Sequence, residues 1–189
     1  MNLFDAQLTF RKVLDAMAKP GKVVKMPNIS LNTPTENKYP FLILTSLLDH
    51  EVGFKVLDVK NRENTEDISR YISSNTGSHE SSLEDADFIL IYDGSSGGTI
   101  HEMKRGTLEY PDESAILIYD ARRIGDGVHL TISGPGIRDE LEIAIDGIEE
   151  EEIRDIVKVN SEFPLGIDVI FSDLYGNIVC LPRSTRVRR

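Results

Sequence analysis

Residues 163–185 have the sequence FPLGIDVIFSDLYGNIVCLPRST, in which two runs of β-branched and aromatic residues flank a short turn. The turn contains Gly176-Asn177, and such a pair between two apolar runs predicts a β-hairpin. Pro182 is expected to end the second strand, because proline has no amide hydrogen to donate to a neighbouring strand. The first strand is apolar almost throughout, which is typical of a strand covered on both faces. We therefore expect this hairpin to lie in a sheet that has other layers packed on it.

Asp168 is the exception in the first strand, because a carboxylate in a buried run needs a partner or a function. Arg183 follows the second strand, so one interpretation is an ion pair between Asp168 and Arg183. Asp168 could also accept hydrogen bonds from nearby backbone amides. The functional alternative is an anion site made by Arg183 with Thr185, because a guanidinium and a hydroxyl suit the geometry of phosphate. The sequence leaves these interpretations open, so the ligand-binding candidates are Asp168, Arg183 and Thr185.

The hydrophobic pattern of the remaining chain predicts helices and strands that alternate. Phe10, Val13, Leu14 and Met17 recur at helical spacing and predict one apolar stripe. The predicted helices cover residues 5–18, 41–48, 63–74, 99–105 and 149–160, with a surface loop at 28–38. The predicted strands cover residues 22–26, 52–59, 87–92, 115–119, 128–133 and 141–145. This order predicts an α/β fold, a three-layer α/β/α sandwich with a mixed sheet, in one domain spanning residues 1–189.

Net charge and composition exclude several classes of protein. The chain of 189 residues has a formal net charge of −11, which disfavours a general nucleic-acid binder. The sequence contains neither an apolar run long enough to span a membrane nor the apolar core of a signal peptide. A single cysteine, Cys180, favours a location in the reducing cytoplasm, and we interpret this residue as a small buried hydrophobic side chain. The acidic run at 149–152 is most simply the first turn of a helix. The basic residues at 184–189 have three interpretations: a phosphate contact, a partner contact or a frayed, flexible tail.

Two glycine-rich segments are candidate phosphate cradles. Residues 93–99, DGSSGGT, follow a predicted buried strand, and their backbone amides could hold a phosphate. The Walker spacing is absent, however, so a plain loop is the alternative for the segment Gly94–Gly98. Gly134-Pro135-Gly136 has the same two interpretations, and a tight connection is the one we favour.

No metal site or nucleophilic site is predicted. The four histidines share no spacing typical of metal ligands. No Gly-x-Ser-x-Gly elbow is present, and Cys180 has no histidine or basic residue beside it. The four histidines are His50, His79, His101 and His129.

Five segments in order resemble one known family. They are FRKVLDAMAKPG at 10–21, LLDHEV at 47–52, Gly106-Thr107 with Pro111, SGPGI at 133–137, and the closing FPLGID and LPRST. Together they resemble the PhnH family, the H subunits of the bacterial phosphonate carbon–phosphorus lyase machinery. Each segment alone is a weak signal, but their common order extends from about residue 5 to residue 187. Residues 55–80 and 187–189 match no segment of that family that we can name.

The resemblance implies a fold and a function. Members of this family look like a reduced large domain of pyridoxal-phosphate-dependent transferases, form homodimers and lack the lysine that holds the cofactor, so we expect no cofactor. In that system the G, H, I and L subunits convert ATP and methylphosphonate to ribose 1-methylphosphonate 5-triphosphate with release of adenine. The I subunit carries the nucleosidase chemistry, and the J subunit cleaves the carbon–phosphorus bond. The resemblance thus implies an accessory subunit that supports the transfer and the assembly of the core complex with the G, I and J subunits.

A rival hypothesis is a stand-alone, small-molecule phosphate-binding transferase or hydrolase that uses the loop Gly94–Gly98. The sequence offers this loop neither a Walker lysine nor metal ligands.

Overall fold

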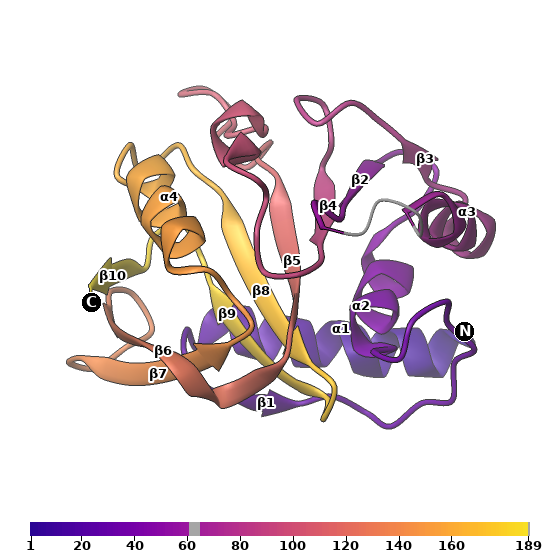
Figure 1. Cartoon of the computed structure of the whole chain (residues 1–189), viewed down its shortest axis with the longest axis horizontal. Coiled ribbons are helices and arrows are strands. Elements are labelled where there is room, and N and C mark those ends of the chain that lie inside the picture. The colour runs from indigo at the N-terminus through magenta and orange to yellow at the C-terminus, as the bar shows by residue number, and fades with distance from the viewer. Residues whose placement is uncertain (61–64, 189) are drawn as a thin grey trace.

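The closing hairpin lies next to one edge strand of a seven-stranded mixed sheet in this computed structural model, which describes residues 1–60 and 65–188. The strands run in the order β1-β9-β8-β5-β4-β2-β3, of which β8, β5, β4, β2 and β3 are parallel to one another (Figure 1). Strand β9 pairs antiparallel with β8, as the Gly-Asn turn predicted, and with β1 on its other side. The strands are β1 (Val24–Lys25), β2 (Gly53–Leu57), β3 (His79–Glu80), β4 (Phe88–Ile91), β5 (Ile116–Ala121), β8 (Asp168–Asp173) and β9 (Asn177–Leu181).

Side chains of the central strands alternate between two hydrophobic cores, one on each face of the sheet. In β4, Phe88 and Leu90 join one core, while Ile89 and Ile91 join the other. The first core is completed by three helices: α1 (Leu3–Ala18), α2 (Tyr39–Leu47) and α3 (Thr65–Thr76). Because both faces are covered, every residue of β4 is buried, and this explains the continuous apolar run in the sequence.

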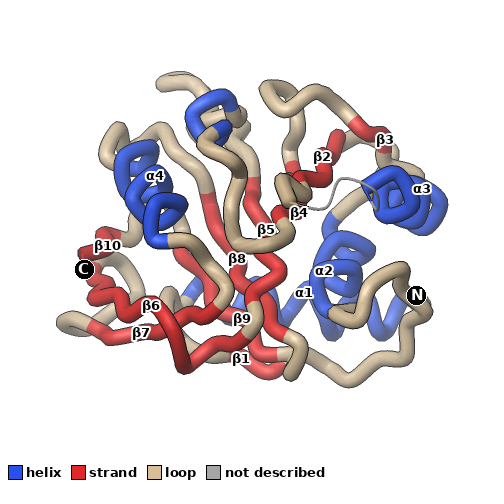
Figure 2. Tube along the Cα trace, viewed as in Figure 1, coloured by secondary structure: helices blue, strands red, loops and turns tan. Residues whose placement is uncertain are grey.

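The other face is covered by helix and sheet together. It packs against α4 (Glu150–Asn160), the short 3₁₀ helix η2 (Thr99–Glu102) and a second, antiparallel sheet of order β10-β6-β7 (Figure 2). The strands of the second sheet are β6 (Arg123–Ser133), β7 (Leu141–Asp146) and β10 (Arg186–Arg188). The predicted mixed α/β architecture with a mixed sheet is therefore confirmed, and the second sheet is an addition that the sequence did not separate from the first.

The basic end of the chain is paired. Arg186, Val187 and Arg188 lie opposite Ser133, Ile132 and Thr131 of β6, as strand β10. Val187 also packs against the hydrophobic core, which anchors the strand. Residues 186–188 are thus not a frayed tail. Arg189, like the first two residues of the predicted helix 63–74, lies outside the described residues.

The apolar stripe predicted for α1 is wrong in part. Val13 is buried as predicted, but Phe10 is 46% exposed and Leu14 is 56% exposed. The helix instead buries Thr9 and Ala16 beside Val13. Small side chains at those two positions let α1 lie close to α2 and β9, which turns its larger apolar residues outward.

Candidate functional site

Asp168 and Arg183 form a nearly buried ion pair, so the structural interpretation of these residues is supported. Arg183 Nη2 lies 2.7 Å from Asp168 Oδ2, and the two side chains are 16% and 18% exposed. The backbone amide of Arg183 also donates to Asp168 Oδ1 at 2.7 Å. Both structural alternatives, ion pairing and amide binding, therefore hold at once, and the carboxylate ties the start of β8 to the residue that follows β9.

Arg183 has a third contact that the sequence did not predict. Its Nη1 donates to the carbonyl oxygen of Pro111, in the turn that begins at Gly106. The same turn is held to the start of β8, because the amide of Gly166 donates to the carbonyl of Arg105 at 3.1 Å. Gly106 has φ +76°, and a Cβ there would lie 2.7 Å from the Pro111 carbonyl oxygen. Segments far apart in the sequence thus meet around one guanidinium.

Asn160, the last residue of α4, fixes the approach to β8. Its side-chain amide accepts from the amide of Ile167 at 2.8 Å and donates to the Ile167 carbonyl at 3.1 Å. Gly166 lies directly against it with φ +147°, and a Cβ there would come within 2.5 Å of Asn160 Oδ1. Glycine is therefore required at this position by both conformation and space.

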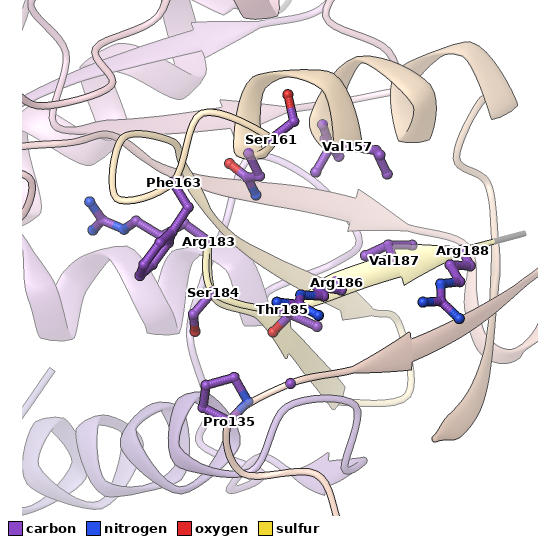
Figure 3. A pocket seen from close by; sticks show the side chains of 13 residues that line it. Pro135, Val157, Ser161, Phe163, Arg183, Ser184, Thr185, Arg186, Val187 and Arg188 are labelled. Atoms are coloured by element: carbon purple, nitrogen blue, oxygen red, sulfur yellow. The ribbon is translucent and has the colours of Figure 1, made fainter. Parts of the chain in front are cut away.

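A cavity of about 720 Å³ opens beside the ion pair (Figure 3). Its walls come from the end of α4 and the loop after it, from the segment 183–188, and from the turn at Gly134-Pro135. Three of the lining residues are arginines and none is acidic, although the chain carries 32 aspartates and glutamates against 21 lysines and arginines. Two of these arginines are paired with carboxylates, Arg183 with Asp168 and Arg188 with Glu140. Arginine side chains are thus gathered on one concave surface of an acidic protein.

Thr185, one of the residues that line this cavity, has a buried hydroxyl. The residue is only 6% exposed, and its Oγ1 has no hydrogen-bond partner among the residues that the structure describes. Its backbone amide is used, since it donates to the Pro182 carbonyl at 2.8 Å. Buried hydroxyls without a partner are uncommon, because the loss of hydration is not offset.

The turn Gly134-Pro135-Gly136 is a tight connection, the interpretation favoured from the sequence. Gly134 has φ +132° and faces the Ser184 carbonyl, which a Cβ would approach to 3.0 Å. Gly136 has φ +85° and faces the Ala18 carbonyl at the same distance. The glycines therefore let this turn pack against the backbone of two other segments.

The loop Gly94–Gly98 does hold an anion, but that anion belongs to the protein. The amide and the hydroxyl of Ser96 donate to Glu152 Oε2 at 2.9 and 3.0 Å. The hydroxyl of Tyr119 donates to the other carboxylate oxygen of Glu152 at 2.5 Å, and Glu152 is 2% exposed. Burial and the neighbouring Glu152 raise the pKa of Tyr119 well above its usual value. These contacts fix the loop to α4 and take up the Ser96 donors that a phosphate would use.

A second cavity, of about 470 Å³, lies where β4 and β5 end. Asp120 in its wall accepts from Asn37 Nδ2 at 2.7 Å, and burial raises the pKa of Asp120 to about 6. Lys60 and Arg122 at this cavity are paired with Glu149 and Asp146. The amide of Asn37 thereby ties the loop before α2 to the end of β5.

Two further findings concern metals and membranes. Within residues 1–60 and 65–188, no three histidine, cysteine, aspartate or glutamate side chains are grouped so that they could hold a metal ion. None of the helices described there combines the length and the hydropathy needed to cross a membrane.

Cys180 is fully buried, and burial raises the pKa of its thiol, as expected for a small core residue.

Comparison with known proteins identifies the family. A sequence profile described as "Bacterial phosphonate metabolism protein (PhnH)" matches residues 1–188. The chain belongs to the PhnH family. A relative from Stutzerimonas stutzeri, "Putative C-P lyase subunit protein HtxG", is 28% identical over 183 residues, which cover 96% of this chain and 85% of the relative. The "Alpha-D-ribose 1-methylphosphonate 5-triphosphate synthase subunit PhnH" of Rhizobium meliloti (strain 1021) is 24% identical over 188 residues, covering 99% of this chain and 92% of that protein.

The segments that resembled the PhnH family are brought together by the fold. The closing segment contacts the Gly106 turn through Arg183 and Gly166, and it contacts the Gly134 turn through Ser184. The Gly134 turn in turn touches the end of α1 at Ala18 and Pro20. Four of the five segments therefore surround one region, and the cavity opens from it.

Reasoning from the sequence missed several polar residues of this PhnH-family fold. Asp173 is fully buried and accepts from the amides of Ile124, Tyr175 and Asn177 and from the Asn177 side chain. Its signal was available, because Asp173 stands in the hairpin turn, where aspartate commonly binds the amides that follow it. Glu152 and Asn160 gave no such signal, since their partners lie on other elements.

Proposed function

We propose that this chain is a subunit of a carbon–phosphorus lyase system for phosphonate catabolism. The observation that carries the proposal is the family match over residues 1–188. The two relatives, which align with 96% and 99% of the chain, are named as a carbon–phosphorus lyase subunit and as a subunit of ribose 1-methylphosphonate 5-triphosphate synthase.

Within that system the proposed task is accessory. The chain supports the transfer of methylphosphonate to the ribose of ATP, with release of adenine, and the assembly of the core complex with the G, I and J subunits in the cytoplasm. Two observations fit this task. Asp168 and Arg183 hold segments together, which is a structural role. The loop Gly94–Gly98 is bound to Glu152, which disfavours the rival transferase or hydrolase.

A homodimer is part of the proposal. Leu3, Phe4, Phe10 and Leu14 leave apolar side chains exposed on α1 by 87%, 72%, 46% and 56%. We name these four residues the α1 apolar face. An exposed apolar face of this kind is typical of protein–protein interfaces. The covered mixed sheet is also compatible with the expected likeness to a reduced pyridoxal-phosphate-dependent transferase domain, in which no cofactor is held.

The experiment is complementation with co-purification. A bacterial strain that lacks its own H subunit receives this chain, together with the other subunits from the same source, and methylphosphonate is the sole phosphorus source. We expect growth, and we expect an affinity tag on this chain to retain the G, I and J subunits. Absence of growth and of the other subunits, with the chain folded and abundant, would refute the proposal.

A further inference from the structure

We propose that the free edge of strand β10 receives an extended segment of a partner protein, in which an apolar residue stands between two acidic ones. Strand β10 (Arg186–Arg188) is the last strand of the second sheet, and β6 is the strand paired with it in the described part of the chain. The inference goes beyond the proposed function, because it rests on this edge and its side chains and not on the role of any relative.

Unpaired backbone is the first step. In an antiparallel pair, alternate residues of a strand direct their amide and carbonyl groups to the neighbouring strand, and the residues between them direct theirs to the opposite side. Within residues 1–60 and 65–188, the backbone of residues 186–188 forms hydrogen bonds with no segment other than β6. The outer edge of β10 therefore has main-chain groups that a further strand can bind.

Space for such a strand is the second step. The cavity of about 720 Å³ is lined by every residue from Arg183 to Arg188, with the end of α4 on its other side (Figure 3). Six extended residues span about 20 Å, so the cavity follows the chain over the length of a short strand. An extended segment can thus lie between β10 and α4.

The side chains of β10 define the partner's sequence, and they are the third step. Arg186 and Arg188 are exposed on one face of the strand, whereas Val187 lies on the other face and packs against the hydrophobic core. Residues directly opposite each other in neighbouring strands share a face and contact each other. The partner residue opposite Val187 is therefore apolar, and Val157 of α4, which is 37% exposed at the cavity, lies ready to contact it.

Charge selects the residues on either side of that apolar one. Arg186 forms no ion pair with the residues that the structure describes, and Arg188 has only an exposed pair with Glu140. No acidic residue lines the cavity, so acidic residues opposite the two arginines complement them. A second copy of β10 would instead bring arginines beside arginines, and like charges opposite each other are destabilising. The occupant is thus a different protein and not another copy of this chain.

The experiment measures the binding of fluorescent peptides to the purified full-length chain by anisotropy. The probe is a short peptide of alternating glutamate and valine with both ends blocked. We expect saturable binding with a Kd below about 1 mM, and affinity that falls as the salt concentration rises. Arg186→Glu should weaken the binding of this peptide by about tenfold or more, which corresponds to about 1.4 kcal/mol.

Two other peptides separate charge from strand pairing. A peptide of alternating lysine and valine has the wrong charge for the arginines. The glutamate and valine peptide with methylated backbone amides has the right charge but cannot donate to a neighbouring strand. Each should bind at least about tenfold more weakly than the probe.

Hydrogen exchange locates the bound peptide. The probe should slow the exchange of at least one amide among residues 186–188, since it supplies the missing hydrogen-bond partner. The amides of β3, an exposed edge strand of the main sheet, should exchange at the same rate with and without the probe.

A matched variant and the contrary outcomes complete the test. Arg70→Glu makes the same charge change on α3, where Arg70 has an exposed pair with Asp67, and should change the affinity for the probe by less than about twofold. The inference is overturned by absence of saturable binding, by equal losses in Arg70→Glu and Arg186→Glu, or by binding without protection of residues 186–188. Protection that rises with protein concentration in the absence of peptide would assign the edge to a second copy and would also overturn it. Failed complementation with intact peptide binding would instead refute only the proposed function.

Discussion

Single carboxylates hold this acidic protein together, each by collecting donors from separate parts of the chain. Asp168 binds the Arg183 side chain and amide, and Glu152 binds Ser96 and Tyr119. Asp173 accepts hydrogen bonds from three backbone amides and one side chain. Buried carboxylates are tolerated in this way, because hydrogen bonds replace the water that they lose.

Removal of either partner of the Asp168–Arg183 pair should destabilise the fold strongly. Asp168→Ala and Arg183→Ala should each lower the free energy of unfolding by about 3–5 kcal/mol, because the remaining charge is left nearly buried without its partner. Chemical denaturation of the two single variants and the double variant should reveal coupling between the sites. Arg122→Ala is the matched control, since its pair with Asp146 leaves Arg122 74% exposed, and it should change stability by less than about 1 kcal/mol.

The opposite result for this pair would have a clear meaning. Unchanged stability in both variants, together with lost adenine release by the assembled complex, would place Asp168 and Arg183 in an active site and refute the structural interpretation.

Asp120 should make stability depend on pH. Burial raises its pKa to about 6 in the folded protein, against 3.8 for a free aspartate. Between these values the folded state keeps a proton that the unfolded chain has lost, so this residue makes folding less favourable as pH rises from about 4 to 6. The effect is at most about 3 kcal/mol.

The matched variant for this effect is Asp120→Asn, which cannot titrate but can still accept from Asn37. Unfolding curves from pH 4 to pH 7 should show the parent losing stability relative to the variant as pH rises. Parallel curves over that range would contradict the prediction.

At the scale of elements, α1 shows how packing selects one face of a helix. It buries Thr9, Val13 and Ala16 against its neighbours and leaves the α1 apolar face outside. The loop between β4 and η2 shows the same dependence on neighbours, because α4 supplies the carboxylate that holds it. The face that a helix buries and the group that a loop binds thus both depend on the neighbouring elements in the fold.

The α1 apolar face should carry the proposed homodimer. The double change Phe10→Ser and Leu14→Ser should convert the dimer to a monomer at micromolar concentration, because it removes apolar area from the contact. Sedimentation velocity measures this directly. Leu108→Ser is the control, since Leu108 is 77% exposed in a loop and should leave the dimer intact. A parent chain that sediments only as a monomer would contradict the homodimer itself.

At the scale of the whole molecule, the sheet, its two cores and the second sheet bring four of the five family segments to one region. The cavity lined by Arg183, Arg186 and Arg188 opens there, on the face that carries α4 and β10.

The isolated chain should therefore not release adenine or inorganic phosphate from ATP and methylphosphonate. The Ser96 amide and hydroxyl, the donors that a phosphate-cradling loop would offer, are occupied by Glu152. Chromatographic detection of adenine from the chain alone and from the assembled complex distinguishes the two cases. Release by the chain alone that Ser96→Ala abolishes would favour the rival enzyme.

Most elements could be predicted from the sequence, because their signals are local. The hairpin follows from Gly176-Asn177 between two apolar runs, and β4 follows from its continuous apolar residues. The family could also be identified, since it depends on the order of short segments. Asp168 stood out for the same reason, as one charge in an apolar strand.

The alternation of helices and strands, the hairpin, the family and the candidate partners Asp168 and Arg183 could all be predicted from the amino-acid sequence. The partner that each polar group takes became visible only in the folded chain. It paired Arg183 with both Asp168 and the Pro111 carbonyl, filled the Gly94–Gly98 loop with Glu152, and turned Phe10 outward. The physical reason is range: hydrophobic periodicity and turn preferences act within a few residues, whereas hydrogen bonds and close packing depend on groups that the chain brings together from distant positions.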